Sequence, residues 1–185
     1  MNVLAISGSL RRHSHNTRLL RTLAGEAPED VSVELWDGLK AIPPYDSDDD
    51  GPTGPRVVED FRRLVRAADA VIIATPEYNA SIPGALKNAL DWASRPIAEN
   101  AFRGKPVAVI ASSTGMFGAV WAAAELRKVL STMGARVVTD VELTVPRAHE
   151  QFDESGVLLG DEVPVSLQEA LAALVESATA EKAAA

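Results

Sequence analysis

Near its start the chain reads Val3-Leu4-Ala5-Ile6-Ser7-Gly8-Ser9-Leu10-Arg11, an apolar run that ends directly in a polar loop. Further along, Ala70-Val71-Ile72-Ile73-Ala74 ends in the same way at Thr75-Pro76-Glu77-Tyr78-Asn79. Each apolar run is typical of a buried strand in a parallel sheet. Ligands bind at the carboxyl edge of such strands in open α/β sheets. The two loops therefore predict one binding site, about seventy residues apart in sequence and close together in space.

Strand-like runs alternate with helical patterns along the chain, which indicates βαβ units. We expect strands at residues 3–7, 31–36, 71–75, 107–112 and 137–143. We expect one helix to begin at Asn16 or Thr17 and another at Pro83, and three more at residues 57–67, 119–133 and 166–177. In the third helix, Leu86, Leu90 and Ala93 are expected in the core, and Lys87 and Asp91 are spaced to pair. The pattern predicts an α/β, flavodoxin-like three-layer sandwich with a five-stranded parallel sheet of order 2-1-3-4-5. Its switch point lies between the first and third strands, which carry the two loops.

The 185 residues are enough for one ordinary domain, which we place at residues 1–180, followed by a frayed alanine-rich tail at 181–185. No repeat or linker divides the chain. The segment Asp37–Pro55 is a long loop rich in Pro, Gly and Asp, and loops of that length are often functional or mobile.

Bulk composition excludes several classes of function. The net charge of −8 argues against nucleic-acid binding, which needs a basic face. The apolar runs are too short to span a bilayer, and the amino terminus shows no signal peptide, so we expect a cytoplasmic protein with no membrane partner. With no cysteine, the chain has no disulfide and no thiolate chemistry, and any redox reaction must use a bound cofactor.

The loop after the first strand carries the donors that a phosphate needs. Side-chain donors at a helix N-terminus come from Ser9, Ser14, Asn16 and Thr17. Arg11 adds a charged guanidinium that can donate two hydrogen bonds at once. Neither a Walker A motif nor GxGxxG is present, so a single terminal phosphate fits better than a triphosphate with magnesium. The alternative is an ordinary turn whose hydroxyls only cap the helix. We interpret His13 and His15 as solvated loop residues.

The loop after the third strand suits a flat heterocycle. Pro76, Glu77, Tyr78 and Asn79 bring backbone donors and acceptors together with an aromatic wall. In the alternative interpretation, Tyr78 packs beneath the next loop and Glu77 is a solvated charge. Ser113 and Gly115, after the fourth strand, lie on the same predicted edge, and Trp121 either lines the pocket or packs in an interface.

The acidic run Asp46-Ser47-Asp48-Asp49-Asp50-Gly51 is similar to the start of an EF-hand loop. Its twelfth position is Val57 instead of glutamate, and Pro44 disrupts the incoming helix, so we interpret it as a solvated acidic loop and expect no metal site.

These motifs give the chain a family resemblance. From Val3 to about Gly156 it resembles the NADPH-dependent FMN reductases, a flavodoxin-like group that includes quinone, chromate and azo-dye reductases. The resemblance is carried by Gly8-Ser9-Leu10-Arg11 with Ser14 and Asn16, Ala74 through Asn79, Ser81-Ile82-Pro83-Gly84, Leu86-Lys87-Asn88, Asp91-Trp92, Leu126-Arg127 and Arg147-Ala148-His149-Glu150. His13 departs from the family, which often has glycine there, and Trp121 stands where a polar or basic residue is common.

The resemblance implies non-covalent FMN, with its phosphate at Ser9, Arg11, Ser14 and Asn16 and its ring held by Pro76 to Asn79, while Ser113 and Gly115 close the far side. It also implies NADPH or NADH as hydride donor and a homodimer or homotetramer. We expect hydride to pass to N5 of FMN and on to a small-molecule electron acceptor such as a quinone, azo compound, chromate or free flavin, with no catalytic side chain.

Three alternatives remain open at this point. A flavodoxin-like electron carrier would hold a semiquinone and react little with pyridine nucleotide. A reductase of the same family would instead release reduced FMN to a monooxygenase. A relative that has lost its cofactor is disfavoured by the intact loops after all three strands.

Overall fold

The computed structural model describes residues 1–51 and 53–184 of the chain. Its strands are β1 (Asn2–Ser7), β2 (Ser32–Trp36), β3 (Ala70–Thr75), β4 (Pro106–Ser112), β5 (Arg136–Val137) and β6 (Leu143–Val145). Its α-helices are α1 (His15–Gly25), α2 (Arg56–Ala67), α3 (Gly84–Ala93), α4 (Val120–Thr132) and α5 (Glu162–Ala184). Short 3₁₀ turns lie at Gly38–Ala41, Ser47–Asp49, Ile97–Glu99 and Ala148–Glu150. Among the described residues, no helix is both long enough and apolar enough to cross a bilayer.

The strands form one parallel sheet of order β2-β1-β3-β4-β5, which confirms the predicted flavodoxin-like topology. Ala5 of β1 is level with Ile72 of β3, which is level with Ala108 of β4. The three central strands are therefore in register, and their carboxyl ends reach the same edge.

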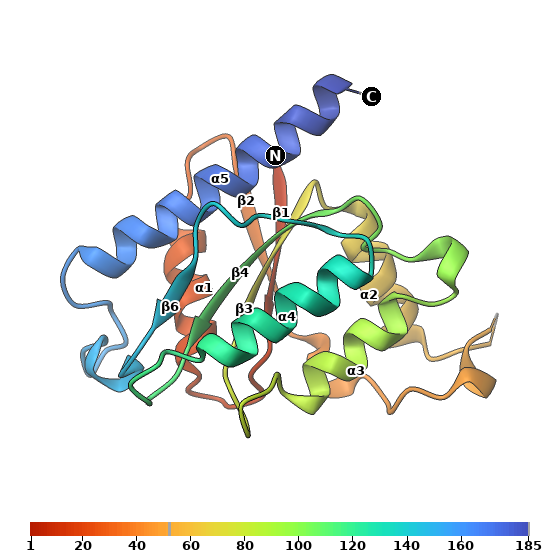
Figure 1. Cartoon of the computed structure of the whole chain (residues 1–185), viewed down its shortest axis with the longest axis horizontal. Helices are drawn as coiled ribbons and strands as arrows, with labels where there is room; N and C mark the ends of the chain where they lie inside the picture. The colour runs from red at the N-terminus through yellow and green to blue at the C-terminus, as the bar shows by residue number, and fades with distance from the viewer. Residues whose placement is uncertain (52, 185) are drawn as a thin grey trace.

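Helices cover both faces of the sheet, as its nearly continuous apolar strands require (Figure 1). On one face α1 and α5 pack against Ala5, Ile72 and Ile110. On the other face α2, α3 and α4 pack against Leu4 and Ile73. The molecule is thus the expected three-layer sandwich, with a core on each side of the sheet.

The fifth predicted strand, residues 137–143, is in fact two short segments. β5 pairs with the start of β4 and β6 with its end, and exposed Thr139 and Asp140 lie between them. The last helix is longer than the predicted 166–177, because the alanine-rich end of the chain favours helix. The predicted frayed tail at 181–185 includes Ala185, which lies outside the described residues, and it stays a prediction.

The loop Asp37–Pro55 is anchored at two places, although Pro52 lies outside the described residues. Asn88 holds both the carbonyl of Pro43, at 2.7 Å, and the amide of Tyr45, at 2.8 Å. Arg62, whose side chain is only 5% exposed, pairs with Asp50 at 2.8 Å and also donates to the carbonyl of Trp92. Asp50 is therefore a partner of a buried guanidinium, and the acidic run is solvated only in part.

Helix α3 is built as the sequence indicates. It begins at Gly84, one residue later than predicted, with Pro83 as its N-cap. Leu86, Leu90 and Ala93 are buried, and Lys87 pairs with Asp91 at 2.7 Å, which confirms both expectations.

Candidate functional site

Three loops meet at the carboxyl edge of the sheet, which is the lower edge in Figure 1. They follow β1, β3 and β4, and they surround a hollow of about 100 Å³, called here the loop hollow. It is lined by Ser9, Arg11, Ser14, His15, Asn16, Pro76, Glu77, Tyr78, Ser112, Ser113 and Thr114. Eight of the eleven predicted site residues are in this lining. Asn79 and Gly115 lie in the same loops and Thr17 lies in the first turn of α1, but all three are outside the lining.

Asn16 joins the first loop to the third. Its amide nitrogen donates to the carbonyl of Ser112 at 3.0 Å, and its amide oxygen accepts from the N–H of Ser112 at 3.1 Å. The side chain is only 3% exposed. Both ends of this amide are therefore engaged in holding α1 against β4, a positioning role that sequence reasoning missed.

Hydroxyl groups order the rest of the first loop. Ser14 caps α1 by accepting from the N–H of Thr17 at 3.2 Å, and the Thr17 hydroxyl donates to Ser7 at 2.8 Å. Ser9 accepts from the N–H of Arg11 at 3.4 Å. The capping interpretation is thus correct for Ser14, yet the hydroxyl protons of Ser9 and Ser14 and the guanidinium of Arg11 have no partner among the described residues.

Two buried polar atoms in the lining lack a protein partner. Within the described part of the chain, neither His15 Nδ1 nor the Ser112 hydroxyl has a hydrogen bond, and both are shielded from solvent. Buried polar groups are nearly always satisfied, so such atoms on the wall of a hollow indicate a ligand or ordered water.

His15 is not the solvated loop residue that was predicted. It is the first residue of α1, and its ring stacks on Phe152 with centroids 5.5 Å apart. Burial lowers the pKa of His15, and the positive charges of Arg18 and Arg11 lower it further. The imidazole therefore favours the neutral form, with one ring nitrogen able to accept. His13, by contrast, is exposed as expected.

The loop after β3 is a tight hairpin. The backbones of Tyr78 and Ser81 exchange two hydrogen bonds, of 3.0 and 3.1 Å, and Asn79 and Ala80 between them both have positive φ. Positive φ at both central residues defines a type I′ turn, which is usually built with glycine. The hairpin makes a rigid wall, so the backbone groups of Tyr78 are not free for a ligand.

Glu77 is not the solvated charge of the alternative interpretation. Its carboxylate is bound by the backbone of α4, although the residue also lines the loop hollow. Its carboxylate accepts from the N–H of Ala122 at 3.0 Å, near the start of α4. Glu125 of α4 accepts in turn from the N–H of Ile82 at 3.3 Å. Two carboxylates thus lock the hairpin to α4, and Glu77 has mainly its backbone to offer a ligand.

The third loop is braced from β6. The N–H of Ser113 donates to the carbonyl of Val145. The carbonyl of Ser113 accepts from the N–H of Ala148 at 2.9 Å. The carbonyl of Gly115 accepts from the N–H of Arg147 at 3.0 Å. This bracing fixes the far side of the loop hollow.

A group of large apolar side chains stands exposed beside the loop hollow. Tyr78 and Trp121 are each 49% exposed, and Met116 and Phe117 are exposed further. Trp121 packs edge-to-face on Phe117, with centroids 5.0 Å apart, and it does not line the loop hollow. Its predicted place in an interface stays a prediction.

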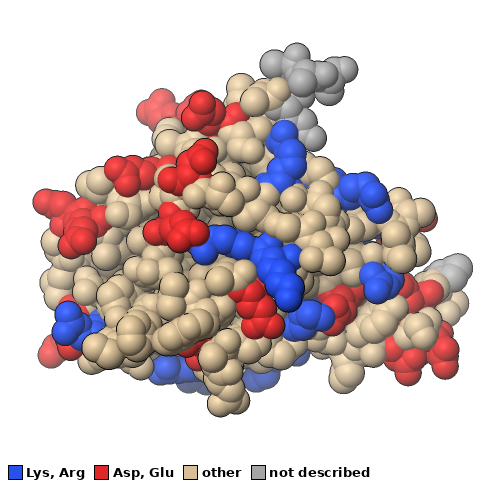
Figure 2. Space-filling view, viewed as in Figure 1, with Lys and Arg blue, Asp and Glu red and all other residues tan. Residues whose placement is uncertain are grey.

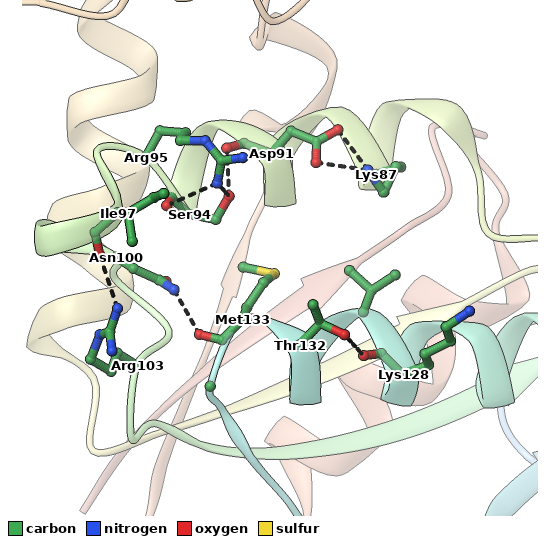
Figure 3. Close-up of a pocket in the computed structure, with 12 residues that line it drawn as sticks. Lys87, Asp91, Ser94, Arg95, Ile97, Asn100, Arg103, Lys128, Thr132 and Met133 are labelled. Carbon is green, nitrogen blue, oxygen red and sulfur yellow. Dashed lines mark hydrogen bonds and ion pairs between the residues drawn. The ribbon is translucent and has the colours of Figure 1, made fainter.

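A larger hollow of about 400 Å³ lies between the carboxyl-terminal parts of α3 and α4, and we call it the α3–α4 hollow (Figure 3). Its polar groups are largely bonded to one another. Lys87 pairs with Asp91, Asn100 donates to the carbonyl of Met133 at 2.6 Å, and Arg103 donates to that of Ile97 at 3.1 Å. The Asn100 bond ties the segment after α3 to the end of α4, and the other two stabilise α3 and that segment, so the roles are structural.

Charge is unevenly distributed over the molecule. Asp and Glu dominate the surface over α5, and Lys and Arg gather at the lower edge near the three loops (Figure 2). An overall acidic chain therefore presents basic groups near the loop after β1.

Comparison with known proteins finds relatives that match most of the chain. A model of the family of NADPH-dependent FMN reductases matches residues 1–150. An NAD(P)H-dependent FMN reductase of Pseudomonas aeruginosa is 43% identical over 94% of this chain and 93% of its own length. A 2-hydroxy-1,4-benzoquinone reductase of a Burkholderia species is 36% identical over 91% of each chain. Among solved structures, the flavoenzyme NAD(P)H:(acceptor) oxidoreductase FerB of Paracoccus denitrificans superposes with a TM-score of 0.87 and 32% identity, over 96% of this chain and 97% of that one.

Proposed function

Because the chain belongs to the NADPH-dependent FMN reductase family, we propose that it binds FMN without a covalent bond and oxidises NAD(P)H with a small-molecule electron acceptor. The observation that carries the proposal is the pair of unpartnered buried atoms, His15 Nδ1 and the Ser112 hydroxyl, on the wall of the loop hollow.

The residues present fit the phosphate end of FMN. Arg11, Ser9 and Ser14 supply unengaged donors beside the N-terminus of α1, where the helix dipole favours an anion. The loop hollow of about 100 Å³ can enclose a phosphate but not a tricyclic ring. The ring would therefore lie over the open edge, against Tyr78 on one side and the Ser113–Gly115 loop on the other.

The chemistry that FMN supplies when bound is acceptance of hydride from NAD(P)H and delivery of electrons to the acceptor. The side chains of this protein bind and orient. Asn16 and Glu77 hold the loops in place, Arg11 binds the phosphate, and the hairpin at Tyr78 forms a rigid wall beside the ring position. No side chain is required as a general acid or base.

The decisive experiment is an absorption spectrum of the purified protein, followed by NADPH without oxygen. A flavin spectrum that bleaches rapidly supports the reductase. A flavin that stays oxidised would favour an electron carrier, and a colourless protein that takes up no FMN would overturn the site assignment. Loss of FMN from the reduced protein would favour a reductase that supplies a monooxygenase.

We also propose that the protein is a homodimer or a homotetramer. The exposed side chains of Tyr78, Met116, Phe117 and Trp121 lie together beside the loop hollow, where a second copy would cover them. Light scattering coupled to gel filtration measures the assembly directly, and a monomer at micromolar concentration would contradict the proposal.

A further inference from the structure

A second hollow lies beside the loop hollow, on the outer side of α1. It measures about 310 Å³ and is lined by Arg12, His13, Arg18, Arg21, Thr22, Ser155 and Gly156. We call it the basic hollow. The two hollows meet at neighbouring residues of the chain. Arg11 lines the loop hollow, and Arg12 lines the basic hollow.

The charge of the basic hollow is positive throughout. Arg12, Arg18 and Arg21 contribute three guanidinium groups, and none of them forms an ion pair with any described residue. No carboxylate is part of the lining. Three unpaired arginines around one hollow are unexpected in a chain of net charge −8, because nearby acids usually neutralise such groups.

The neighbouring acid, Asp153, is already engaged. Its carboxylate accepts from the Ser155 hydroxyl at 2.6 Å and from the N–H of Val157 at 2.9 Å. These bonds fold the turn that brings Ser155 and Gly156 to the rim, so Asp153 shapes the basic hollow and forms no ion pair with its three arginines among the described residues.

Arg18 is held in place by contacts that leave its donors free. Its guanidinium carbon lies 5.6 Å from the centre of the Phe152 ring. Gly156, with φ of +90°, passes so close that a Cβ there would lie 3.3 Å from Arg18 Nε. Phe152 and Gly156 thus fix the position of the guanidinium without accepting a hydrogen bond from it. A positioned donor without an acceptor is preorganised for an anion.

We propose that the basic hollow binds the 2′-phosphate of NADPH and gives the protein a preference for NADPH over NADH. This inference rests on the proposed function. An arginine fork matches the oxygens of a phosphate, and arginine beside the ribose is the usual way to accept a 2′-phosphate. In this arrangement the nicotinamide would reach the flavin and the adenosine end would lie at Arg12, Arg18 and Arg21, since the lining of the basic hollow begins at Arg12, next in the chain to Arg11 of the loop hollow. NADH lacks the 2′-phosphate and keeps only the pyrophosphate that both nucleotides share, so it loses the charge-assisted bonds that distinguish the two.

The first test measures binding and not activity. FMN-loaded protein is titrated by calorimetry with 2′,5′-ADP, with 5′-ADP and with inorganic phosphate. We expect 2′,5′-ADP to bind at least about tenfold more tightly than either of the others, because two or more charge-assisted hydrogen bonds are gained. Equal binding of 2′,5′-ADP and 5′-ADP would overturn the proposal, and equal binding of inorganic phosphate would reduce the hollow to a general anion site.

The second test uses matched variants. Arg12→Gln/Arg21→Gln removes two exposed arginines of the basic hollow and spares Arg18, which packs on Phe152. Arg56→Gln/Arg63→Gln makes the same change of charge on α2, at side chains that are 95% and 68% exposed. We expect the first variant to lose the preference for 2′,5′-ADP and the second to keep it. Equal losses in both would show that only overall charge matters.

Kinetics separates this inference from the proposed function. In the Arg12→Gln/Arg21→Gln variant, kcat/KM for NADPH should fall at least about tenfold while that for NADH is unchanged. A wild-type protein that oxidises NADPH without any preference for 2′,5′-ADP contradicts only the basic hollow. A flavin-loaded protein that oxidises neither nucleotide contradicts the proposed function, and calorimetry still decides what the hollow binds.

Discussion

The loop hollow and the α3–α4 hollow differ in a way that size does not reveal. The α3–α4 hollow is about four times larger, at roughly 400 against 100 Å³, yet its polar groups are mostly bonded to one another. The lining of the loop hollow includes two buried polar atoms with no partner among the described residues, His15 Nδ1 and the Ser112 hydroxyl. The lining of the α3–α4 hollow includes no such atom among the described residues. We therefore use unsatisfied hydrogen-bonding capacity, and not volume, to choose the proposed ligand site.

The largest expected difference between the two hollows comes from two asparagines, one at each hollow, whose side chains hydrogen-bond to two backbone groups. Asn16→Ala leaves the N–H and C=O of buried Ser112 without partners, and we expect it to lower the free energy of unfolding by about 2–4 kcal/mol. It should also weaken FMN binding more than about tenfold, because the loop loses its position. Denaturant unfolding and flavin titration measure the two effects.

Asn100→Ala is the matched control at the α3–α4 hollow. Asn100 also holds two backbone groups, the carbonyl of Met133 and the N–H of Phe102. This variant should lose stability and keep its affinity for FMN. If Asn16→Ala fails to fold, Asn16→Asp retains an acceptor of the same size, and unchanged FMN affinity in either variant would contradict the positioning role.

Arg11→Ala should weaken FMN binding by about 10- to 100-fold with little change in stability, because an exposed arginine loses its charge-assisted bonds to phosphate. Quenching of flavin fluorescence gives the dissociation constant. Arg103→Ala, at the α3–α4 hollow, is the control and should leave that constant unchanged. Normal flavin retention in Arg11→Ala would remove the phosphate assignment.

Tyr78→Ala should have a smaller effect, about 3- to 10-fold on FMN affinity, since one aromatic contact is lost while the hairpin backbone remains. Turnover with NADPH should change as well, because the ring position becomes more exposed. Steady-state kinetics and the flavin spectrum provide the measurement. An effect as large as that of Arg11→Ala would mean that Tyr78 supports the fold of the loop.

The smallest expected effect is a dependence on pH. Burial lowers the pKa of His15 in the folded protein, so its contribution to stability is complete above pH 6.5 and is lost as the pH falls from there through the lowered pKa. Unfolding measured between pH 7.5 and 5.5 should show this loss, and His15→Gln should reduce it. If the stability of His15→Gln depended on pH as that of the wild type does, His15 would not be the cause of the loss.

The fold was predictable from the sequence because β1, β3 and β4 are almost wholly apolar and end in polar loops. The division of the last strand into β5 and β6 could not be predicted. Thr139 and Asp140 interrupt it, but the run as a whole still has the composition of a strand. Of the site, the loops and most lining residues could be predicted because they follow directly from the strand ends.

The roles of single side chains in the site depend on distant partners and could not be predicted. Asn16 bonds to Ser112, Glu77 to Ala122, and His15 stacks on Phe152. No local pattern contains these pairs. The hairpin at Tyr78 was also missed, because its turn uses Asn79 and Ala80 where the usual signal is Asn-Gly.

The bond from Asn16 to Ser112 has a consequence for the order in which the protein is made. The two residues are 96 positions apart, so α1 emerges from the ribosome long before its partner strand exists. Until β4 has been synthesised, the loop after β1 and the start of α1 lack the contact that fixes them. The proposed cofactor site therefore cannot mature on the growing amino-terminal half, and we expect FMN to join the chain only after more than half of it has been synthesised.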